Sequence, residues 1–407
     1  MKILKESNIL MIIIFCYSIP MLFSLFFSGS ILSIWKQFFW VIVVYVLLTN
    51  KLFFNKGYVF IYKHFWKSLF LLLFFSIVVF LFYGFNFKRI VFSVWVYLAG
   101  IPFFIYPFLI VKEKKFTAFY YLILGLSVST ITGLIVDHFT GIFNLISIAG
   151  GSDRQLLRGE FRRSSFLFES PTALVNFMNF LVVIVSIFFL NSKSKLKKIF
   201  YFILLLGFLL SSYFTGSRQV LLTTGLIIFF AFIFFLKKIN FFSMLFVFAS
   251  VLLFFLFYSN SDLNEIINTE TGAFLIQRIT DTDFSEDTRS ISWAEGISQF
   301  SLFNAHYWFF GHGIGTTMGQ HAVEGEKIHS HFESAVYAVF YEIGLIAFFI
   351  VFYPIRYFMK VLRKHCYGYE RKMMYLYYLT AILIFFIAPG GMHFTSSMSI
   401  YILGGVV

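Results

Sequence analysis

The sequence has little charge for its size, and this shortage decides its class. Only 13% of the 407 residues are charged, against about a quarter in an average soluble domain, and 59% are hydrophobic. Apolar runs of about 18 or more residues recur along the whole chain, and a helix needs a run of that length to cross about 30 Å of hydrocarbon. A single soluble core cannot bury so many runs. The sequence therefore predicts an integral membrane protein.

Cysteine is almost absent, which argues against a disulfide framework. The two cysteines, Cys16 in an apolar segment and Cys366 in a basic loop, fall at different predicted levels of the membrane. The alternating polarity of barrel strands is missing too, because segments such as 202–210 and 226–236 are apolar on every side. We therefore predict an all-α, polytopic transmembrane helix bundle.

The apolar segments predict about twelve membrane spans. The first follows Lys2 and Lys5 and shows no small-residue cleavage site, so we expect an uncleaved helix. The predicted spans are 8–29, 31–50, 66–84, 90–111, 116–136, 171–190, 198–215, 219–236, 241–258, 334–355, 373–388 and 391–406.

The distribution of lysine predicts the orientation. Cytoplasmic loops carry an excess of positive charge, so both termini and the lysine-rich loops are expected in the cytoplasm, and the net charge of +13 needs no nucleic-acid partner. Two long polar segments then fall outside, and the second holds two amphipathic stretches that predict short surface helices. The chain divides into N-terminal spans (1–136), a first outer loop (137–170), central spans (171–259), a large outer loop (260–333) and C-terminal spans (334–407).

Basic residues on the predicted outer side are mostly arginine. Insertion topology does not ask for arginine there, whereas its planar fork binds phosphate in a bidentate way. An outer anionic ligand is one interpretation, and pairing with nearby acids or lipid headgroups is the other. The residues concerned are Lys88, Arg89, Arg154, Arg158, Arg162, Arg163, Arg218, Arg278, Arg289 and Lys327.

Arg218 is the arginine that favours the ligand interpretation most. It ends the sequence Thr215-Gly216-Ser217-Arg218, a tight break between two apolar spans. The guanidinium is therefore expected at the outer membrane boundary beside a helix N-terminus, where anions are favoured. A phosphate on a lipid carrier would arrive at that depth.

Two further polar segments are candidates for chemistry. Gly311, Gly313 and Gly315 alternate with other residues and suit either close approach of a sugar or phosphate or a plain loop, and no Walker lysine follows them. Further on, three titratable residues precede a predicted span and are candidates for proton transfer; a metal site lacks a third well-placed ligand. They are His329, His331 and Glu333.

Four stretches in this order resemble the O-antigen polymerase and ligase superfamily of bacterial surface-polysaccharide assembly. They are residues 163–171 (Arg-Ser-Ser-Phe, then Glu-Ser-Pro), 215–218 (Thr-Gly-Ser-Arg), 309–316 (Phe-Phe-Gly-His-Gly-Ile-Gly-Thr) and 329–345 (His-Ser-His-Phe-Glu-Ser, then Tyr-Glu-Ile-Gly-Leu). The likeness covers roughly residues 115–390, and is closest to a polymerase of lipid-linked repeat units.

The resemblance implies a metal-independent glycosyl transfer on the outer face of the bacterial cytoplasmic membrane, without a cofactor. The substrate would be an oligosaccharide on undecaprenyl pyrophosphate, and a chain-length regulator would be a further partner. Arg218 and Arg289 would hold the pyrophosphate, with Arg162 and Arg163 nearby, and the base would be His329, His331 or Glu333.

The ligases usually carry a His-Asn pair where this chain has no asparagine after either histidine, so the base stays open and the ligase reading is weakened. Glu169, Gly313 and Gly315 are candidates for sugar binding, and Glu169 suits charge balance with Arg162 and Arg163 as well. The competing functions are a ligase that moves finished polymer to lipid A core and a flippase for lipid-linked sugars. A flippase is disfavoured because the predicted span interiors carry almost no charge apart from Lys36 and Glu342.

Overall fold

The computed structural model describes part of the chain in detail. The described residues are 116–142, 171–236, 305–311 and 368–387, with the shorter pieces 70, 74, 77, 157–158, 161–162, 164, 166, 340–341 and 344–345. The predicted spans 8–29, 31–50, 90–111, 241–258 and 391–406 lie outside them, and only scattered residues represent 66–84 and 334–355. The total of twelve spans therefore stays a prediction.

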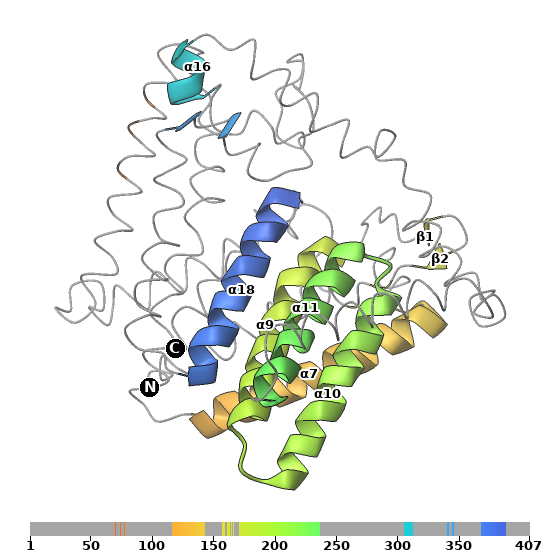
Figure 1. Ribbon diagram of the computed structural model, residues 1–407. Helices are drawn as coiled ribbons and strands as arrows, with labels where there is room; N and C mark the ends of the chain where they lie inside the picture. The colour runs from red at the N-terminus through yellow and green to blue at the C-terminus, as the bar shows by residue number, and fades with distance from the viewer. Residues whose placement is uncertain are drawn as a thin grey trace, which may run out of the picture.

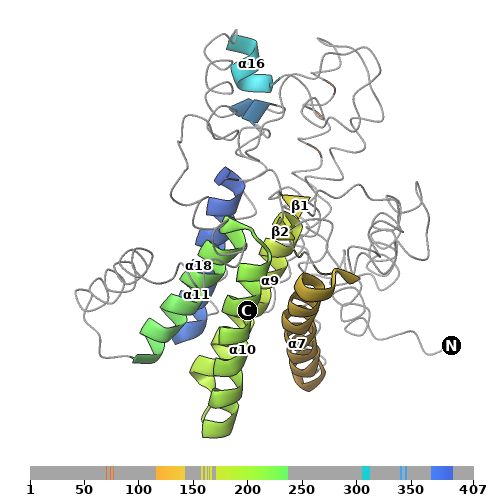
Figure 2. The ribbon, with the colours of Figure 1, turned by 90° about the vertical axis from the view of Figure 1, so that its right-hand side faces the viewer.

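Five long helices form the described bundle (Figures 1 and 2). They are α7 (Phe116–Thr140), α9 (Pro171–Asn191), α10 (Lys195–Phe214), α11 (Arg218–Leu236) and α18 (Gly368–Ile387). The short helix α16 (Ala305–Phe310) follows further along the chain. Helical structure, predicted from the unbroken apolar runs, is confirmed for this part of the chain.

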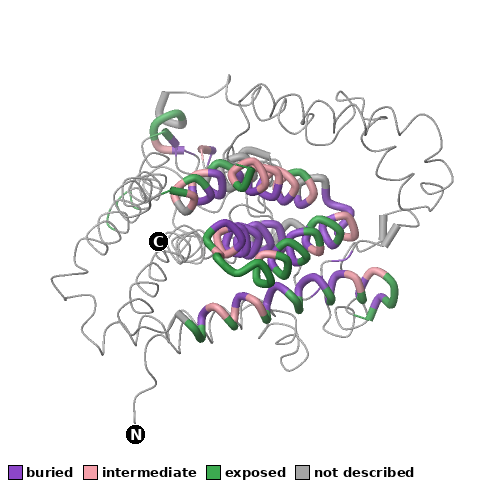
Figure 3. Tube along the Cα trace, turned by 60° about the horizontal axis from the view of Figure 1, so that its bottom comes forward, coloured by how far each residue is buried: buried purple, intermediate pink, exposed green. Residues whose placement is uncertain are grey.

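Helix α9 is the centre of the bundle and contacts α7, α10, α11 and α18. Every residue from 177 to 186 is buried, so α9 has no exposed face over three turns (Figure 3). Such a helix needs internal partners for its polar groups. Asn179 finds them on α11: its amide nitrogen donates to Thr223 (2.9 Å), and its oxygen accepts from Thr224 (3.2 Å).

Helix α10 exposes an apolar face, and its buried face combines Tyr201, Leu204, Leu205 and Phe208 with two serines. Ser211 and Ser212 are buried, whereas a stripe of aliphatic residues at helical spacing is exposed. A long exposed stripe of aliphatic side chains is unusual on a water-facing helix and is typical of a helix that faces lipid. The exposed stripe consists of Leu196, Ile199, Ile203, Leu206 and Leu210.

Among the described residues, two helices are long and apolar enough to cross a membrane: Thr117–Thr140 in α7 and Lys195–Phe214 in α10. At about 1.5 Å per residue, the 25 residues of α7 extend for about 37 Å. Phe177–Asn191 and Val220–Leu236 are shorter apolar helical stretches. These helices are the part of the predicted bundle that the structure supports directly.

Local signals explain several helix boundaries. Helix α9 begins at Pro171, whose fixed φ suits the first helical turn. Helix α7 runs four residues past the predicted end of its span, through Asp137 to Thr140. Gly141 closes it with φ 65° and donates its amide to the Asp137 carbonyl (2.8 Å), which is the usual glycine termination.

One minimal β ladder interrupts the all-α pattern of the described residues. Strands β1 (Leu157–Arg158) and β2 (Phe161–Arg162) pair antiparallel within the predicted first outer loop. This hairpin was not predicted from the sequence. It fixes the backbone of Arg162 two residues before Ser164, where the chain meets the helix bundle.

Candidate functional site

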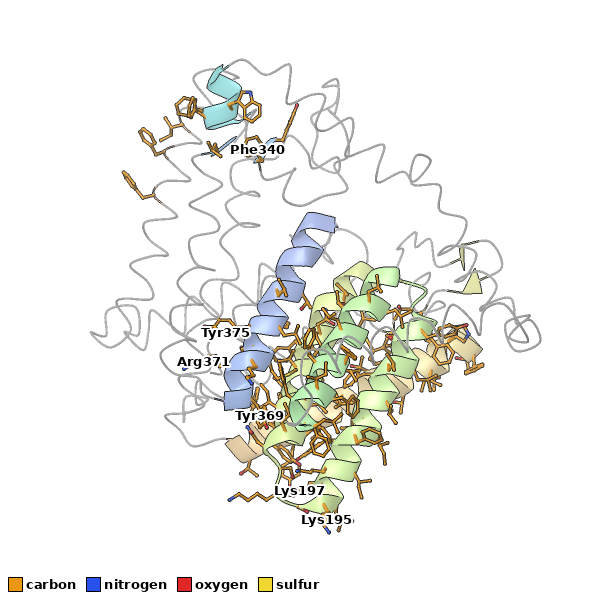
Figure 4. All side chains as sticks on the ribbon, viewed as in Figure 1. Lys195, Lys197, Phe340, Tyr369, Arg371 and Tyr375 are labelled. Atoms are coloured by element: carbon orange, nitrogen blue, oxygen red, sulfur yellow. The ribbon has the colours of Figure 1, made fainter. Side chains whose placement is uncertain are left out.

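The two ends of the bundle carry different residues. The lysine end has exposed or half-exposed amines at the starts of α10 and α18 (Figure 4). Its members are Lys193, Lys195, Lys197, Lys198 and Lys372. At the opposite end, here named the Asp137 end, Asp137 and Ser164 lie beside the turn from Thr215 to Arg218. The candidate site lies at the Asp137 end.

The turn between α10 and α11 is built by the Thr-Gly-Ser-Arg sequence itself. The Thr215 hydroxyl donates to the Ser212 carbonyl (2.7 Å) and accepts from the Ser217 amide (3.2 Å). Gly216 adopts φ 57°, a conformation that favours glycine. Ser217 then accepts the Leu221 amide (3.1 Å) as the first turn of α11 forms. Arg218 is the first residue of α11, one residue before the start of the predicted span 219–236.

Ser164 connects this turn to α7. Its amide donates to the carbonyl of Phe214 (3.1 Å), the last residue of α10, and its hydroxyl donates to the Asp137 carboxylate (2.6 Å). Ser164 is fully buried and Asp137 is 1% exposed, so neither hydrogen bond competes with bulk water. One serine thus joins three segments that lie far apart in sequence.

Aromatic rings support the same junction on both sides. The His138 ring packs on Phe214 with centroids 4.5 Å apart. Phe166, two residues after Ser164, is buried and lies against Gly133, where an added Cβ would come within 2.2 Å of its ring. Phe166 also adopts φ 51°, which is uncommon for a non-glycine residue and requires support from its surroundings. Ser164 and Phe166 therefore both contact α7.

The third and fourth motif stretches also meet. Gly344 has φ 67°, and a Cβ there would lie 2.5 Å from the Phe309 carbonyl oxygen and 2.6 Å from the Gly311 amide nitrogen. The rings of Trp308 and Phe340 pack edge to face with centroids 5.6 Å apart. Backbone contact this close needs glycine. The end of α16 and the stretch around 340–345 thus form a second junction.

The predicted site residues are only partly among the described ones. Backbone positions are defined for Arg218 at the start of α11 and for Arg162 in β2. The remaining candidates, whose assignments stay predictions, lie outside the described residues: Arg163, Glu169, Arg289, Gly313, Gly315, His329, His331 and Glu333. No group of three or more potential metal ligands occurs within the ranges described above.

Asp137 and His138 were missed as site residues by the sequence analysis. A signal was present, because Asp137 is the only acid between 116 and 142. It was interpreted as the start of the outer loop, whereas the structure places it inside α7 and buries it. A single acidic residue at the end of an apolar run is therefore as compatible with a buried hydrogen bond as with the end of a helix.

The comparisons with known proteins add no assignment: no family matches this chain, and no curated protein does.

Proposed function

We propose that this protein is a bacterial inner-membrane glycosyltransferase that polymerises oligosaccharide repeat units carried on undecaprenyl pyrophosphate. The product is O-antigen or a related surface polysaccharide, made at the outer face of the cytoplasmic membrane. In this proposal both termini are cytoplasmic, the lysine end faces the cytoplasm and the Asp137 end faces outward. No metal or other cofactor takes part.

The observation that carries the proposal is the pairing of the four motif stretches. Ser164 of the first stretch hydrogen-bonds Phe214 beside the second, and Gly344 of the fourth packs on Phe309 and Gly311 of the third. Each stretch alone is short and weakly specific. The two pairings support a role for the four stretches in one function.

The proposed chemistry needs a charge-stabilising group and a base. An acceptor hydroxyl attacks the anomeric carbon of the donor sugar, the bond from that carbon to the pyrophosphate oxygen breaks, and undecaprenyl pyrophosphate leaves. The departing group gains negative charge, and in this proposal the guanidinium of Arg218, the first residue of α11, stabilises the transition state. The hydroxyl proton passes to His329, His331 or Glu333, which the sequence offers as candidate bases.

Membrane placement is supported by the burial pattern. Exposed aliphatic side chains along α10 match a lipid-facing surface, and the buried Asn179 cluster satisfies polar groups inside the bundle. The amines at the lysine end match the excess of positive charge on the cytoplasmic side. With α10 starting inside, α11 starts outside, which puts Arg218 at the level of a lipid-borne pyrophosphate.

The experiment is the lipopolysaccharide ladder of a strain deleted for this gene, complemented with the wild type or with Arg218→Ala. A polymerase predicts core plus a single repeat unit in the deletion strain, a restored ladder with the wild type and none with Arg218→Ala. Bare core with lipid-linked polymer accumulating would indicate a ligase. A full ladder in the deletion strain would contradict both enzyme functions.

A further inference from the structure

We propose that the surface at the start of α10 binds an anionic phospholipid, with the lipid phosphate between Lys195 and Lys197 and an acyl chain along the exposed stripe from Leu196 to Leu210. This lipid site goes beyond the proposed glycosyl transfer. It shares with that function only the placement of the bundle in a membrane.

Positive charge and apolar surface meet at this end of α10. The side chains of Lys195 and Lys197 are exposed, and Figure 4 shows both at the end of the helix. At about 100° per residue, these two lysines lie about 100° to either side of Leu196, where the stripe begins. Leu196 is 80% exposed, and Ile203, about two turns further along, is 59% exposed. The two amines therefore flank one end of the stripe, as the charged head of a lipid and its apolar chain require.

Tyrosines indicate the level of the membrane boundary. Tyr121, near the start of α7, is 66% exposed, and the hydroxyl of its neighbour Tyr120 lies 2.6 Å from that of Tyr201 on α10. Tyrosine is enriched where hydrocarbon meets the headgroups. Lys197 and Lys195 precede Tyr201 by about 6 and 9 Å along the helix, and the headgroup layer on each side of a bilayer is about 5–8 Å thick. This spacing matches amines at the level of the lipid phosphates.

Carboxylates are scarce around these amines. Helix α10 packs against α7, α9 and α11. The sequences of these three helices and of α10 contain a single acidic residue, Asp137, which lies at the far end of α7. An anionic headgroup is a counter-charge that the bilayer itself can supply. The surface therefore favours anionic over zwitterionic lipid.

Lys198 carries the same charge on another face of the helix. It lies about 200° from Leu196, and its ammonium is 5.2 Å from the centre of the Phe235 ring on α11. Lys198 thus faces a neighbouring helix, whereas Lys195 and Lys197 flank the stripe. It is the matched control, because its removal changes the net charge equally. Since lysine stems are flexible, we expect selection for charge and not for one particular headgroup.

The test measures lipid preference beside the stripe. A fluorophore is attached to Ile199→Cys in the full-length protein, in which Cys16 and Cys366 are changed to serine. In vesicles, its quenching by phosphatidylglycerol with a spin label on the acyl chain is compared with quenching by phosphatidylcholine labelled in the same way. An exposed charge pair contributes on the order of threefold in affinity, so the parent protein should prefer phosphatidylglycerol about tenfold.

The lysine variants decide whether the two flanking amines cause this preference. Lys195→Gln and Lys197→Gln should each lower it about threefold, and the double variant should abolish it. Lys198→Gln should change it by less than about twofold, because its charge faces α11. An equal loss with all three single variants would show that the preference follows net charge, and would overturn the site. Equal quenching of the parent protein by both lipids would do the same.

A soluble phosphate separates lipid from other sources of the same charge. Glycerol 3-phosphate in excess should leave the quenching unchanged, because it has no acyl chain to lie along the stripe. Loss of quenching would indicate a site for soluble phosphate compounds and would contradict the lipid site.

The lipid site and the proposed function can fail separately, because the quenching assay needs no polymerisation. A protein that prefers phosphatidylglycerol but makes no polymer supports the lipid site and contradicts the glycosyl transfer. A protein that makes polymer without any lipid preference contradicts the lipid site alone.

Discussion

The lysine end and the Asp137 end of the bundle differ in how their polar groups are held. At the lysine end the amines lie on the surface, and two of them rest on rings: Lys198 is 5.2 Å from the Phe235 centroid and Lys372 is 5.1 Å from that of Phe234. At the Asp137 end the polar groups are buried and joined across distant segments, Ser164 to Asp137 and to Phe214.

The two ends therefore place different requirements on the sequence. Surface amines stay hydrated and need no particular geometry. What sets the orientation of the protein in the membrane is the number of positive charges on one side. Buried polar groups must be satisfied by specific partners, which restricts the sequence and fixes the backbone. Specific geometry is what a binding site needs, so substitutions at the two ends should differ in kind as well as in size.

The largest difference is expected for matched charge removals. Arg218→Gln should abolish the polysaccharide ladder, a loss of about 100-fold or more in polymerisation, because one fixed charge-stabilising group typically contributes that factor. Lys198→Gln, at the lysine end, should leave the ladder intact. Both are measured by complementation of the deletion strain, with protein amount determined by immunoblot. Equal ladders would remove the distinction between the ends.

The next largest difference compares two glycines with positive φ. Gly344→Ala should destabilise the protein by about 3 kcal/mol or more, since its Cβ would lie 2.5 Å from a backbone carbonyl oxygen. Gly368, at the start of α18, has φ 60° but nothing within 4 Å of its Cβ position, so Gly368→Ala should cost only about 1 kcal/mol. Unfolding in mixed micelles measures both, and similar midpoints would argue against the junction of α16 with Gly344.

A smaller contrast exists along α7. At Gly133, in the half of the helix toward Asp137, an added Cβ would lie 2.2 Å from the Phe166 ring, so the ring would have to move. Gly133→Ala should therefore lower the free energy of unfolding by about 1–3 kcal/mol. At Gly125, toward the lysine end, the space is open, so Gly125→Ala should be neutral or stabilise the helix by up to about 1 kcal/mol. The same unfolding measurement applies, and a stabilising Gly133→Ala would mean that Phe166 does not lie there.

The smallest effect is expected at the lysine end itself. Lys372→Gln removes the ammonium over the Phe234 ring, a contact worth about 0.5–1 kcal/mol at an exposed site. We expect a slightly lower unfolding midpoint and unchanged polymer length. A loss of polymer with this variant would show that the lysine end is needed for function, which would contradict the distinction between the two ends.

Helix positions were predictable from sequence where local signals were strong. Helix α9 was placed within one residue because Pro171 opens it and the polar stretch after Asn191 ends it. The start of α18 was predicted five residues late because Gly368, Tyr369, Glu370 and Arg371 are polar enough to suggest a loop. A helix end is thus predictable where a local signal such as Pro171 marks it, and is missed where polar residues belong to the helix.

The candidate site was predictable only in part, because its contacts are long-range. The turn from Thr215 to Arg218 is formed by consecutive residues, and the start of the helix after it was predicted within one residue. The hydrogen bond from Ser164 to Asp137 joins residues 27 positions apart, and the sequence does not indicate which residue will bind a single aspartate. Likewise, the sequence does not predict the close contact between the backbones of Gly344 and Phe309.

The most direct test of the account is polymerisation by the purified protein in lipid vesicles, in excess EDTA, with one repeat unit on undecaprenyl pyrophosphate as substrate. We predict that longer lipid-linked chains form without metal, that undecaprenyl pyrophosphate is released for each unit added, and that Arg218→Ala abolishes both. Absence of polymer from the wild type, a requirement for added metal, or full activity of Arg218→Ala would contradict it.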